Sequence, residues 1–383
     1  MIDVPKSAST RADQNAMQAV QILLLGVLPI SLLVMIVVST AGQQYGFDFH
    51  GSLWEASRDI VAGRNPYPPA TADGVAPGDE FVYPPLPALL SIPLGVMPYP
   101  WAAGVMTALL LLAMAAALLA LGVRDWRCHG ATLASILLLH DVRLGAITPL
   151  LVLGVALVWR FRDSTYAAVP FALVVVAKVF FWPLGIWLLA TRRVRAVGIA
   201  VVLTLGLVLA SWAVIGFAGM KEYPELLSVL ARVEQADGYS VVAAAMSAGM
   251  AAAAARVVAV CLGVALLAWA WRAGRRGSDL RSFAMVIGAC FVLTPILWLH
   301  YFLLLYVPIA IRSPRFSAGW LLPLAFWATP FQENFGSPWR IYYAGVVTVV
   351  ILVWATRDSD PRSEPGAQEY RRRVSLLPGP RRD

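Results

Sequence analysis

Three ionisable side chains that could do chemistry stand among apolar neighbours in the sequence. Asp48 lies between Phe47 and Phe49, Lys178 lies within the apolar run 176–180, and His300 lies in the segment 297–301. A carboxylate beside an apolar cavity can act as a general base. A lysine can hold a phosphate, and a histidine can bind a phosphate or transfer a proton.

Long apolar helices are the elements that must position these residues. Of 383 residues, 59% are hydrophobic and 14% are charged, against about 25% charged in a soluble domain. Blocks such as 21–38, 101–123 and 196–218 are each long enough to cross ~30 Å of hydrocarbon as a helix. They lack the alternation of a membrane β-barrel. The first block is too long for a signal peptide, so the chain is predicted to be an all-α polytopic membrane protein.

Basic clusters between the apolar segments predict the orientation. The net charge is +8, and placing every cluster in the cytoplasm satisfies the positive-inside rule. This placement predicts about twelve transmembrane helices in one domain, residues 1–356, and a disordered basic cytoplasmic tail, residues 357–383. It puts three hairpin tips outside, at 140–143, near Lys178 and at 298–301. Several predicted spans are shorter than the ~17–25 residues of a full crossing, and short half-helices pack on protein or line a cavity.

Residues 41–100 form a long, net acidic extracytoplasmic loop in this topology. Apolar residues at 49, 53, 56 and 60 recur at helical spacing, and Gly63 with Asn65-Pro66 ends the pattern. This spacing predicts an amphipathic helix on the membrane surface. Residues 86–96 are predicted to form a second interfacial or re-entrant helix. Asp48, Lys178 and His300 then face one outer cavity, in a topology derived from the arginines alone.

Each candidate has a structural alternative that the sequence leaves open. Asp48 could cap the helix that follows it. Lys178 could extend to the interface, although an ionisable residue inside a membrane is a functional hypothesis by default. His300 could belong to the interfacial aromatic belt. Asp141 and Arg143, in the first tip, could pair with each other.

Motifs for several other functions are absent from the sequence. It contains no P-loop, no H-E-x-x-H and no dinucleotide-binding glycine motif after a strand. The four histidines lie far apart, and the three cysteines form no C-x-x-C. We therefore expect no metal, no cofactor, no nucleotide and no nucleic-acid partner. If the chain is an enzyme, its activated substrate arrives through the membrane.

Four short elements resemble the signature of a known enzyme family. Asp48 followed by A-G-R-N-P-Y at 62–67 resembles the D…G-x-[ND]-P-Y element of the polyprenol-phosphate-sugar-dependent glycosyltransferases of family 87, in the GT-C superfamily. F-V-Y-P-P-L at 81–86, with Pro93 and Pro98, resembles the family's F-x-Y-P-P-L…P-L…P element. Lys178 with Pro183 resembles its K-x-x-P element, and W-L-H-Y at 298–301 resembles its W-x-H-[HY] element.

The resemblance implies a GT-C-type fold and a hexosyltransferase of the mycobacterial alpha-mannosyltransferase kind. Such an enzyme transfers mannose, with inversion, from polyprenyl-phosphate-mannose to a lipid-linked or glycan hydroxyl outside the plasma membrane. Asp48 would be the catalytic base, and Lys178 and His300 would contact the donor phosphate. Tyr83 and Arg64, which stand in the matching elements, and Arg143 are further candidate substrate-binding residues.

The sequence also departs from the family at two places. Gly145-Ala146 stands where the family usually has Gly-Gln, and the segment 238–240 stands where it usually has Asn-x-Ser. Both departures concern the identity of the sugar or the acceptor. A polytopic lipid or sugar transporter, or flippase, is the alternative function. A transporter tends to show internal repeats and broken helices near the midplane, and we find no such repeat. An assembly subunit would not need the three candidates on one face.

Overall fold

The structure, a computed structural model, describes residues 9–40, 45–76, 78, 80–329 and 337–357. It is 77% helix, and no strand occurs among the described residues. The tail that the sequence predicts to be disordered, 357–383, lies outside the described residues except for Arg357.

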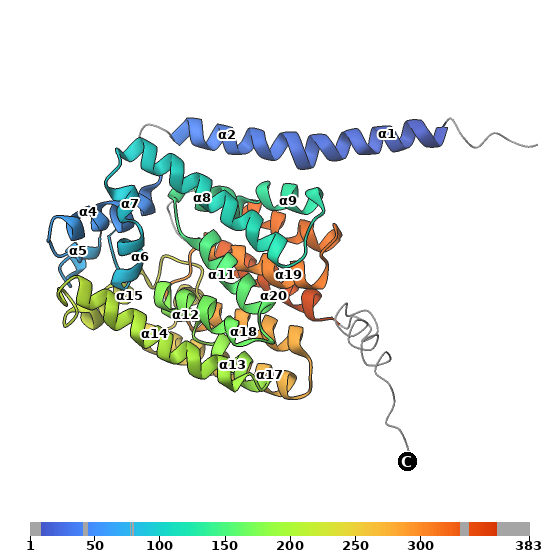
Figure 1. Cartoon of the computed structure of the whole chain (residues 1–383). Helices are drawn as coiled ribbons and strands as arrows, with labels where there is room; N and C mark the ends of the chain where they lie inside the picture. Colours follow the sequence, from blue (N-terminus) through green and yellow to red (C-terminus); the bar gives the residue numbers. More distant parts are fainter. Residues whose placement is uncertain (1–8, 41–44, 77, 79, 330–336, 358–383) are drawn as a thin grey trace, which may run out of the picture.

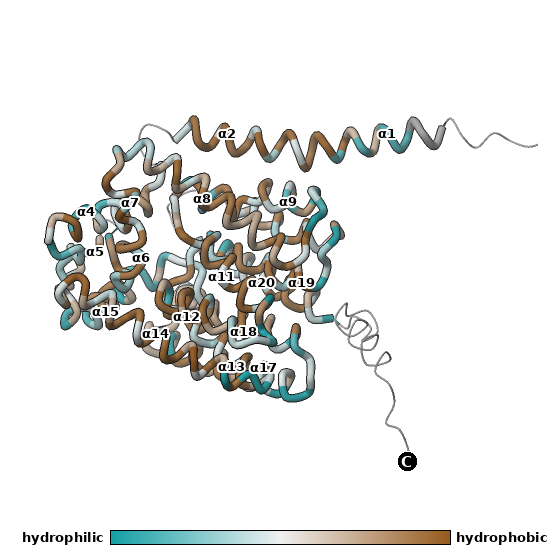
Figure 2. The backbone as a smooth tube through the Cα atoms, viewed as in Figure 1, coloured by the Kyte–Doolittle hydropathy of each residue, from teal (hydrophilic) through white to brown (hydrophobic). Residues whose placement is uncertain are grey.

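Five helical segments of the described chain are long and apolar enough to cross a membrane. The chain is therefore a multi-pass helical membrane protein. Figure 2 shows that apolar residues predominate along much of these helices, whereas the N-terminal part of the first is more polar. The five are the segment built from α1 (Ser9–Ile22), η1 (Leu23–Val27) and α2 (Leu28–Thr40), then α8 (Tyr99–Ala120), α14 (Val194–Val214), α17 (Ala252–Arg275) and α20 (Pro338–Thr356).

Shorter helices lie between the long ones, and Figure 1 shows how they pack into one bundle. The first group, before and after α8, comprises α3 (Phe47–Phe49), η2 (His50–Glu55), α4 (Ala56–Val61), α5 (Ala72–Val75), α6 (Pro85–Leu90), α7 (Ile92–Gly95), α9 (Trp126–Leu133), α10 (Ile136–Leu144) and α11 (Thr148–Arg160). The second group comprises η3 (Thr165–Ala167), α12 (Ala168–Ala177), η4 (Val179–Phe181), α13 (Leu184–Ala190), α15 (Tyr223–Glu234), α16 (Val241–Ser247), α18 (Asp279–Leu293), η5 (Leu299–Leu305), α19 (Tyr306–Arg312) and η6 (Ala318–Ala328).

The predicted short half-helices are present in the structure. Besides the five long segments, five apolar helical stretches of 10–17 residues occur among the described residues. The predicted count of about twelve crossings stays a prediction, because helices of this length do not reach across ~30 Å by themselves. They pack instead on other helices, as α11 does on α8 and α12 does on α14.

The first predicted hairpin tip is wrong in detail. Residues 140–143 lie inside α10, not between two helices. The Ser135 hydroxyl accepts from the Leu137 amide and caps the start of α10, and Gly145, with φ of 69°, ends it. Asp141 and Val142 are buried against other helices, so this polar segment does not form the expected water-exposed turn.

The helix predicted at the start of the outer loop is present, but its apolar face packs on protein. Helical turns run from Phe47 through Val61. Phe49, Leu53 and Ala56 are buried in the main core, and α4 contacts α6 and α7. The segment predicted as a second interfacial helix consists of α6 and α7, which have six and four residues. Neither is long enough to span a membrane.

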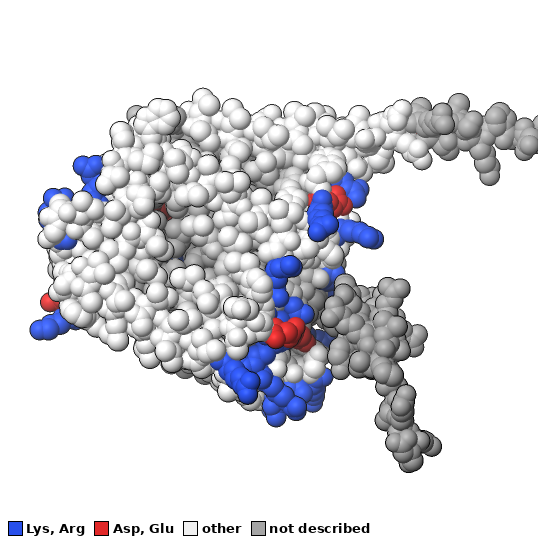
Figure 3. All heavy atoms as spheres, viewed as in Figure 1, with Lys and Arg blue, Asp and Glu red and all other residues white. Residues whose placement is uncertain are grey.

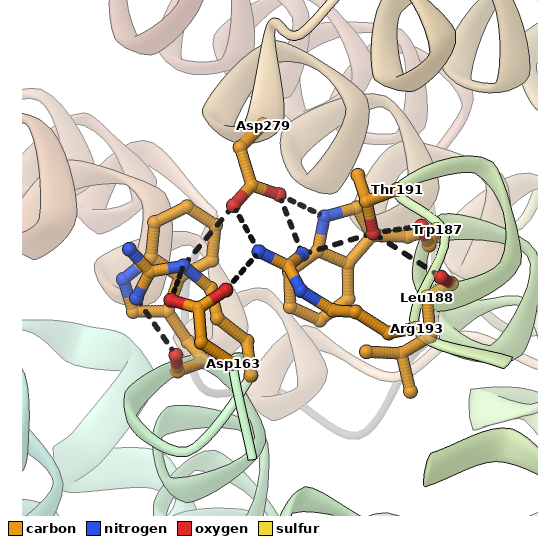
Figure 4. Close-up of polar contacts among 8 residues, drawn as sticks. Asp163, Trp187, Leu188, Thr191, Arg193 and Asp279 are labelled. Carbon is orange, nitrogen blue, oxygen red and sulfur yellow. Dashed lines mark hydrogen bonds and ion pairs between the residues drawn. The ribbon is translucent and has the colours of Figure 1, made fainter. Parts of the chain in front are cut away.

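Basic side chains gather at one end of the bundle, over the ends of α13 and α17 (Figure 3). We name this region the basic end; its arginines include 160, 162, 192, 193, 195, 272, 275 and 276. A partly buried ion-pair network, the Asp279 network, ties α13, α14 and α18 together there (Figure 4). The Asp279 carboxylate accepts four hydrogen bonds: two from Arg193 (3.0 and 2.8 Å), one from Arg162 (3.0 Å) and one from the Trp187 indole (2.6 Å). Arg193 also pairs with Asp163 at 2.7 Å.

A second acidic residue near the basic end is equally well paired. Asp125 accepts from the amide and guanidinium of Arg127, which starts α9, and from the amide of Phe316 at 3.1 Å. The hydrogen bonds from the Arg127 side chain hold the pKa of Asp125 down at about 2. The carboxylate therefore stays ionised and joins α9 to the segment before η6.

Candidate active site

Lys178 lies at a break between two helices, as the sequence predicts. It follows α12 in an extended conformation (φ −147°, ψ 106°), and η4 begins directly after it. Its Nζ donates to the Tyr301 hydroxyl at 2.5 Å and lies 4.4 Å from the centre of the Tyr83 ring. The two aromatic side chains, from the outer loop and from η5, thus form the walls around the ammonium group.

The short helices set how deep this ammonium group lies. The apolar helical stretch before Lys178 runs from Thr165 to Ala177 and consists of η3 and the ten residues of α12, which corresponds to a rise of about 20 Å. That is shorter than the ~30 Å hydrocarbon core. Lys178 therefore lies well inside the bundle, where a full-length helix would have carried the chain past this level.

Two carboxylates act on the Lys178 ammonium group. Asp48, from α3, and Asp141, from α10, both interact electrostatically with it, and each also acts on Tyr83 and on Tyr301. A buried cation requires nearby negative charge, because burial alone costs several kcal/mol. We name this group the buried polar cluster; its members are Asp48, Tyr83, His140, Asp141, Lys178, His300 and Tyr301.

The turn that carries Asp48 is held against the end of α10. The Gly46 amide donates to the Arg143 carbonyl at 2.8 Å, and Gly46 adopts a left-handed conformation (φ 74°) as α3 begins. A Cβ on Gly145 would lie 2.7 Å from the Cβ of Phe49 and 3.2 Å from the Cα of Gly46. The absence of a side chain at 145 therefore lets Asp48 approach the cluster.

His300 joins the cluster from η5. It is 2% exposed, its ring centre lies 6.2 Å from that of His140, and it interacts electrostatically with Lys178. His300 thus lies between the two groups, close to Lys178 and to His140.

Tyr83 is held by a clamp of aromatic residues at the outer loop. The Tyr67 hydroxyl donates to the Tyr83 carbonyl at 2.9 Å, and the Tyr223 hydroxyl donates to the Val82 carbonyl at 3.0 Å. Burial, with the nearby charges of Asp48 and Asp141, raises the pKa of Tyr83, so its hydroxyl stays protonated. A separate pocket of about 220 Å³ opens beside the clamp and is lined by Asn65, Tyr67 and Glu222, among others.

Asp141 is a member that the sequence reasoning missed as a site residue. It is fully buried. The Thr148 hydroxyl and amide, at the start of α11, face its carboxylate and interact with it, but within the described residues neither oxygen is held by a hydrogen bond of normal geometry. A signal was available: Asp141 is an acidic residue in an apolar run, like Asp48. Because Asp141 was expected to pair with Arg143, it was not predicted to be a site residue.

The structure thus brings four of the six predicted site residues together: Asp48, Tyr83, Lys178 and His300. Arg143 reaches the same place through its backbone contact with Gly46. Arg64 does not join them, because its side chain is 64% exposed and pairs with Asp59 at 2.5 Å. Among the described residues, no group of three His, Cys, Asp or Glu could hold a metal ion.

The fold and the cluster together define an integral membrane protein with a buried cation and two carboxylates at one site. Residues 81–297, more than half of the chain, match glycosyltransferase family 87. The chain belongs to this family and is a membrane glycosyltransferase. No curated protein and no solved structure matches it. Tyr83, Asp141 and Lys178 fall within the matched residues, whereas Asp48 and His300 lie outside them.

Proposed function

We propose that the protein transfers mannose from polyprenyl-phosphate-mannose to a hydroxyl of a lipid-linked or glycan acceptor, with inversion, on the outer face of the plasma membrane. The observation that carries the proposal is the position of Lys178. Its ammonium group follows a helical stretch too short to cross the membrane, and two carboxylates act on it. A lipid donor presents its phosphate to the protein from within the membrane, where this cation can meet it.

In the proposed reaction Asp48 takes the proton of the acceptor hydroxyl. The acceptor oxygen then attacks the anomeric carbon, and the bond from that carbon to the phosphate oxygen breaks. The electron pair leaves with polyprenyl phosphate, whose added negative charge is stabilised by Lys178, with His300 nearby. No acid is needed for the leaving group, because phosphate is already a stable anion.

The outer location rests on the positive-inside rule. The arginines of the basic end mark the cytoplasmic side, and α12 and α18 both start there and lead to Lys178 and towards His300. A cysteine placed at Asp73 in the outer loop should react with an impermeant label on intact cells. Labelling only after permeabilisation would reverse the proposed orientation.

Asp48→Asn tests the catalytic assignment. Membranes containing the variant, given radiolabelled polyprenyl-phosphate-mannose, should transfer about 10²–10⁴-fold more slowly than wild type. Asp59→Asn is the matched control, because Asp59 lies in the same segment but pairs with Arg64 at the surface. Normal transfer by Asp48→Asn at normal expression would contradict the proposed base.

A further inference from the structure

Asp141, in the buried polar cluster, has fewer hydrogen-bond donors than a buried carboxylate normally needs. A fully buried carboxylate without hydrogen-bond donors is unfavourable, because it loses its hydration without replacement. Among the described residues, no hydrogen bond of normal geometry reaches either oxygen of Asp141 or the Thr148 hydroxyl that faces them, although the two residues are close enough to interact. Two weakly held polar side chains, from α10 and α11, thus face one another.

The local structure supplies only part of what Asp141 needs. Thr148 is the first residue of α11, a 13-residue helix, so the carboxylate faces the positive end of a helix dipole. Lys178 adds an attractive charge nearby. Both lie close to Asp141, but among the described residues no hydrogen bond of normal geometry reaches the carboxylate. We expect water or a ligand to supply further donors.

Lys178 and Asp141 carry opposite charges and therefore favour different parts of a sugar-phosphate donor. Lys178 attracts a phosphate, whereas a carboxylate repels one. Asp141 can instead accept hydrogen bonds from neutral hydroxyl groups, of which a hexose has several. In the donor, the hydroxyl on C2 lies next to the anomeric carbon that carries the phosphate, so a residue beside the phosphate-binding lysine meets this hydroxyl first.

We infer that Asp141, with Thr148, forms a subsite that binds ring hydroxyls of the donor sugar next to the phosphate and thereby selects the sugar. This inference rests on the proposed function, since it places the donor phosphate at Lys178. It assigns to Asp141 a role in binding and specificity, separate from proton removal by Asp48. Mannose and glucose differ in the orientation of the C2 hydroxyl, so the subsite acts where these sugars differ.

The experiment measures binding without turnover. Purified Asp48→Asn protein and the double variant Asp48→Asn/Asp141→Asn are titrated with polyprenyl-phosphate-mannose and with its 2-deoxy analogue, and Kd is obtained from thermal shift. In the Asp48→Asn protein the 2-deoxy analogue should bind about 10–100-fold more weakly, the usual effect of one hydrogen bond to a charged group. In the double variant the ratio of the two Kd values should fall to about 2–10-fold, because the asparagine amide oxygen still accepts a hydrogen bond but carries no charge.

Thr148→Val, also in the Asp48→Asn protein, keeps the inference testable if the double variant does not fold. It should lower the ratio of the two Kd values (2-deoxy analogue over polyprenyl-phosphate-mannose) by a smaller factor. The reason is that it removes the hydroxyl that faces Asp141 and leaves the carboxylate in place. Asp59→Asn serves as the control that leaves the ratio unchanged.

The outcomes separate the two proposals. An unchanged ratio in both the Asp141 and Thr148 variants overturns the subsite, as does equal binding of the two donors by the Asp48→Asn protein, and in both cases the proposed donor stands. If neither polyprenyl phosphate sugar binds any variant, and wild-type membranes transfer no mannose, the proposed function itself fails.

Discussion

The molecule contains two buried groups of charged residues that are built in opposite ways. In the Asp279 network, every oxygen of the central carboxylate accepts hydrogen bonds from arginine or tryptophan donors. In the buried polar cluster, Asp141 is more deeply buried, yet among the described residues no arginine or tryptophan donates to it and Thr148 is the donor that faces it.

This difference distinguishes a structural role from a functional one. A satisfied ion-pair network fixes the relative positions of α13, α14 and α18 and has little capacity left for a ligand. A cluster with unsatisfied groups is costly in the free protein, and that cost is recovered when a ligand supplies the missing donors. Perturbed buried groups of this kind are typical of active sites.

Of the substitutions that compare the two groups, Lys178→Met should produce the largest change, and mainly in activity. Removing the cation that meets the donor phosphate should slow mannose transfer by about 10²–10³-fold. The assay is transfer from radiolabelled polyprenyl-phosphate-mannose in membranes with matched protein amounts. The midpoint of thermal unfolding should fall less than in the Asp279 variant described next; a larger fall would make Lys178 a structural residue.

Two matched substitutions, Asp279→Asn and Asp141→Asn, should separate the two groups by stability. Asp279→Asn removes the charge that two arginines share and should cost about 3 kcal/mol, near the lower end for a buried ion pair, because the Asp279 side chain is 25% exposed. Asp141→Asn should leave stability equal or higher, since it removes a buried charge that lacks donors. Chemical unfolding of the purified proteins measures both. Equal losses of unfolding free energy in the two variants would contradict the difference between a structural and a functional group.

Gly145→Ala should have an intermediate effect on both properties. The added methyl group would lie 2.7 Å from Phe49, and the residue would have to keep a φ of 69°. Overpacking and strain together should cost about 1–3 kcal/mol. Because the turn carrying Asp48 must move, transfer should fall as well, and Gly104→Ala, where nothing lies within 4 Å, serves as the control. Full activity at lowered stability would show that the turn does not position Asp48.

Arg64→Ala should have the smallest effect. The Arg64–Asp59 pair is exposed, and such pairs contribute about 0.2–1 kcal/mol. Transfer rates for this variant should stay within about threefold of wild type by that same estimate. A loss comparable to that of Lys178→Met would return Arg64 to the set of substrate-binding residues that the sequence predicts.

Much of the architecture could be predicted from the sequence because the membrane imposes strict rules. Apolar blocks predict the helical class, and the basic clusters on either side predict that Lys178 lies near the tip of a short hairpin. The four elements that resemble family 87 predict the family, which the match over 81–297 confirms. These features are local, so the sequence displays them directly.

The missed features depend on contacts between distant segments. The sequence shows polar residues at 140–143, and polarity in a membrane protein usually indicates water. Only packing shows that α10 carries them into the core, where Asp141 faces Thr148. Arg64 shows the converse, because it stands in a matching element but lies at the surface.

Gly145 also limits how this enzyme can diversify. The contact between its bare backbone and Phe49 leaves no space for a side chain, so a library aimed at new sugar choices gains nothing from this position. Variation can instead be directed to the partners of the two carboxylates, such as Thr148 and Tyr83, which contact the site without supporting the turn. Gly145 therefore belongs to the part of the site that tolerates no substitution, whereas Thr148 and Tyr83 belong to the part in which substitutions can change the choice of sugar.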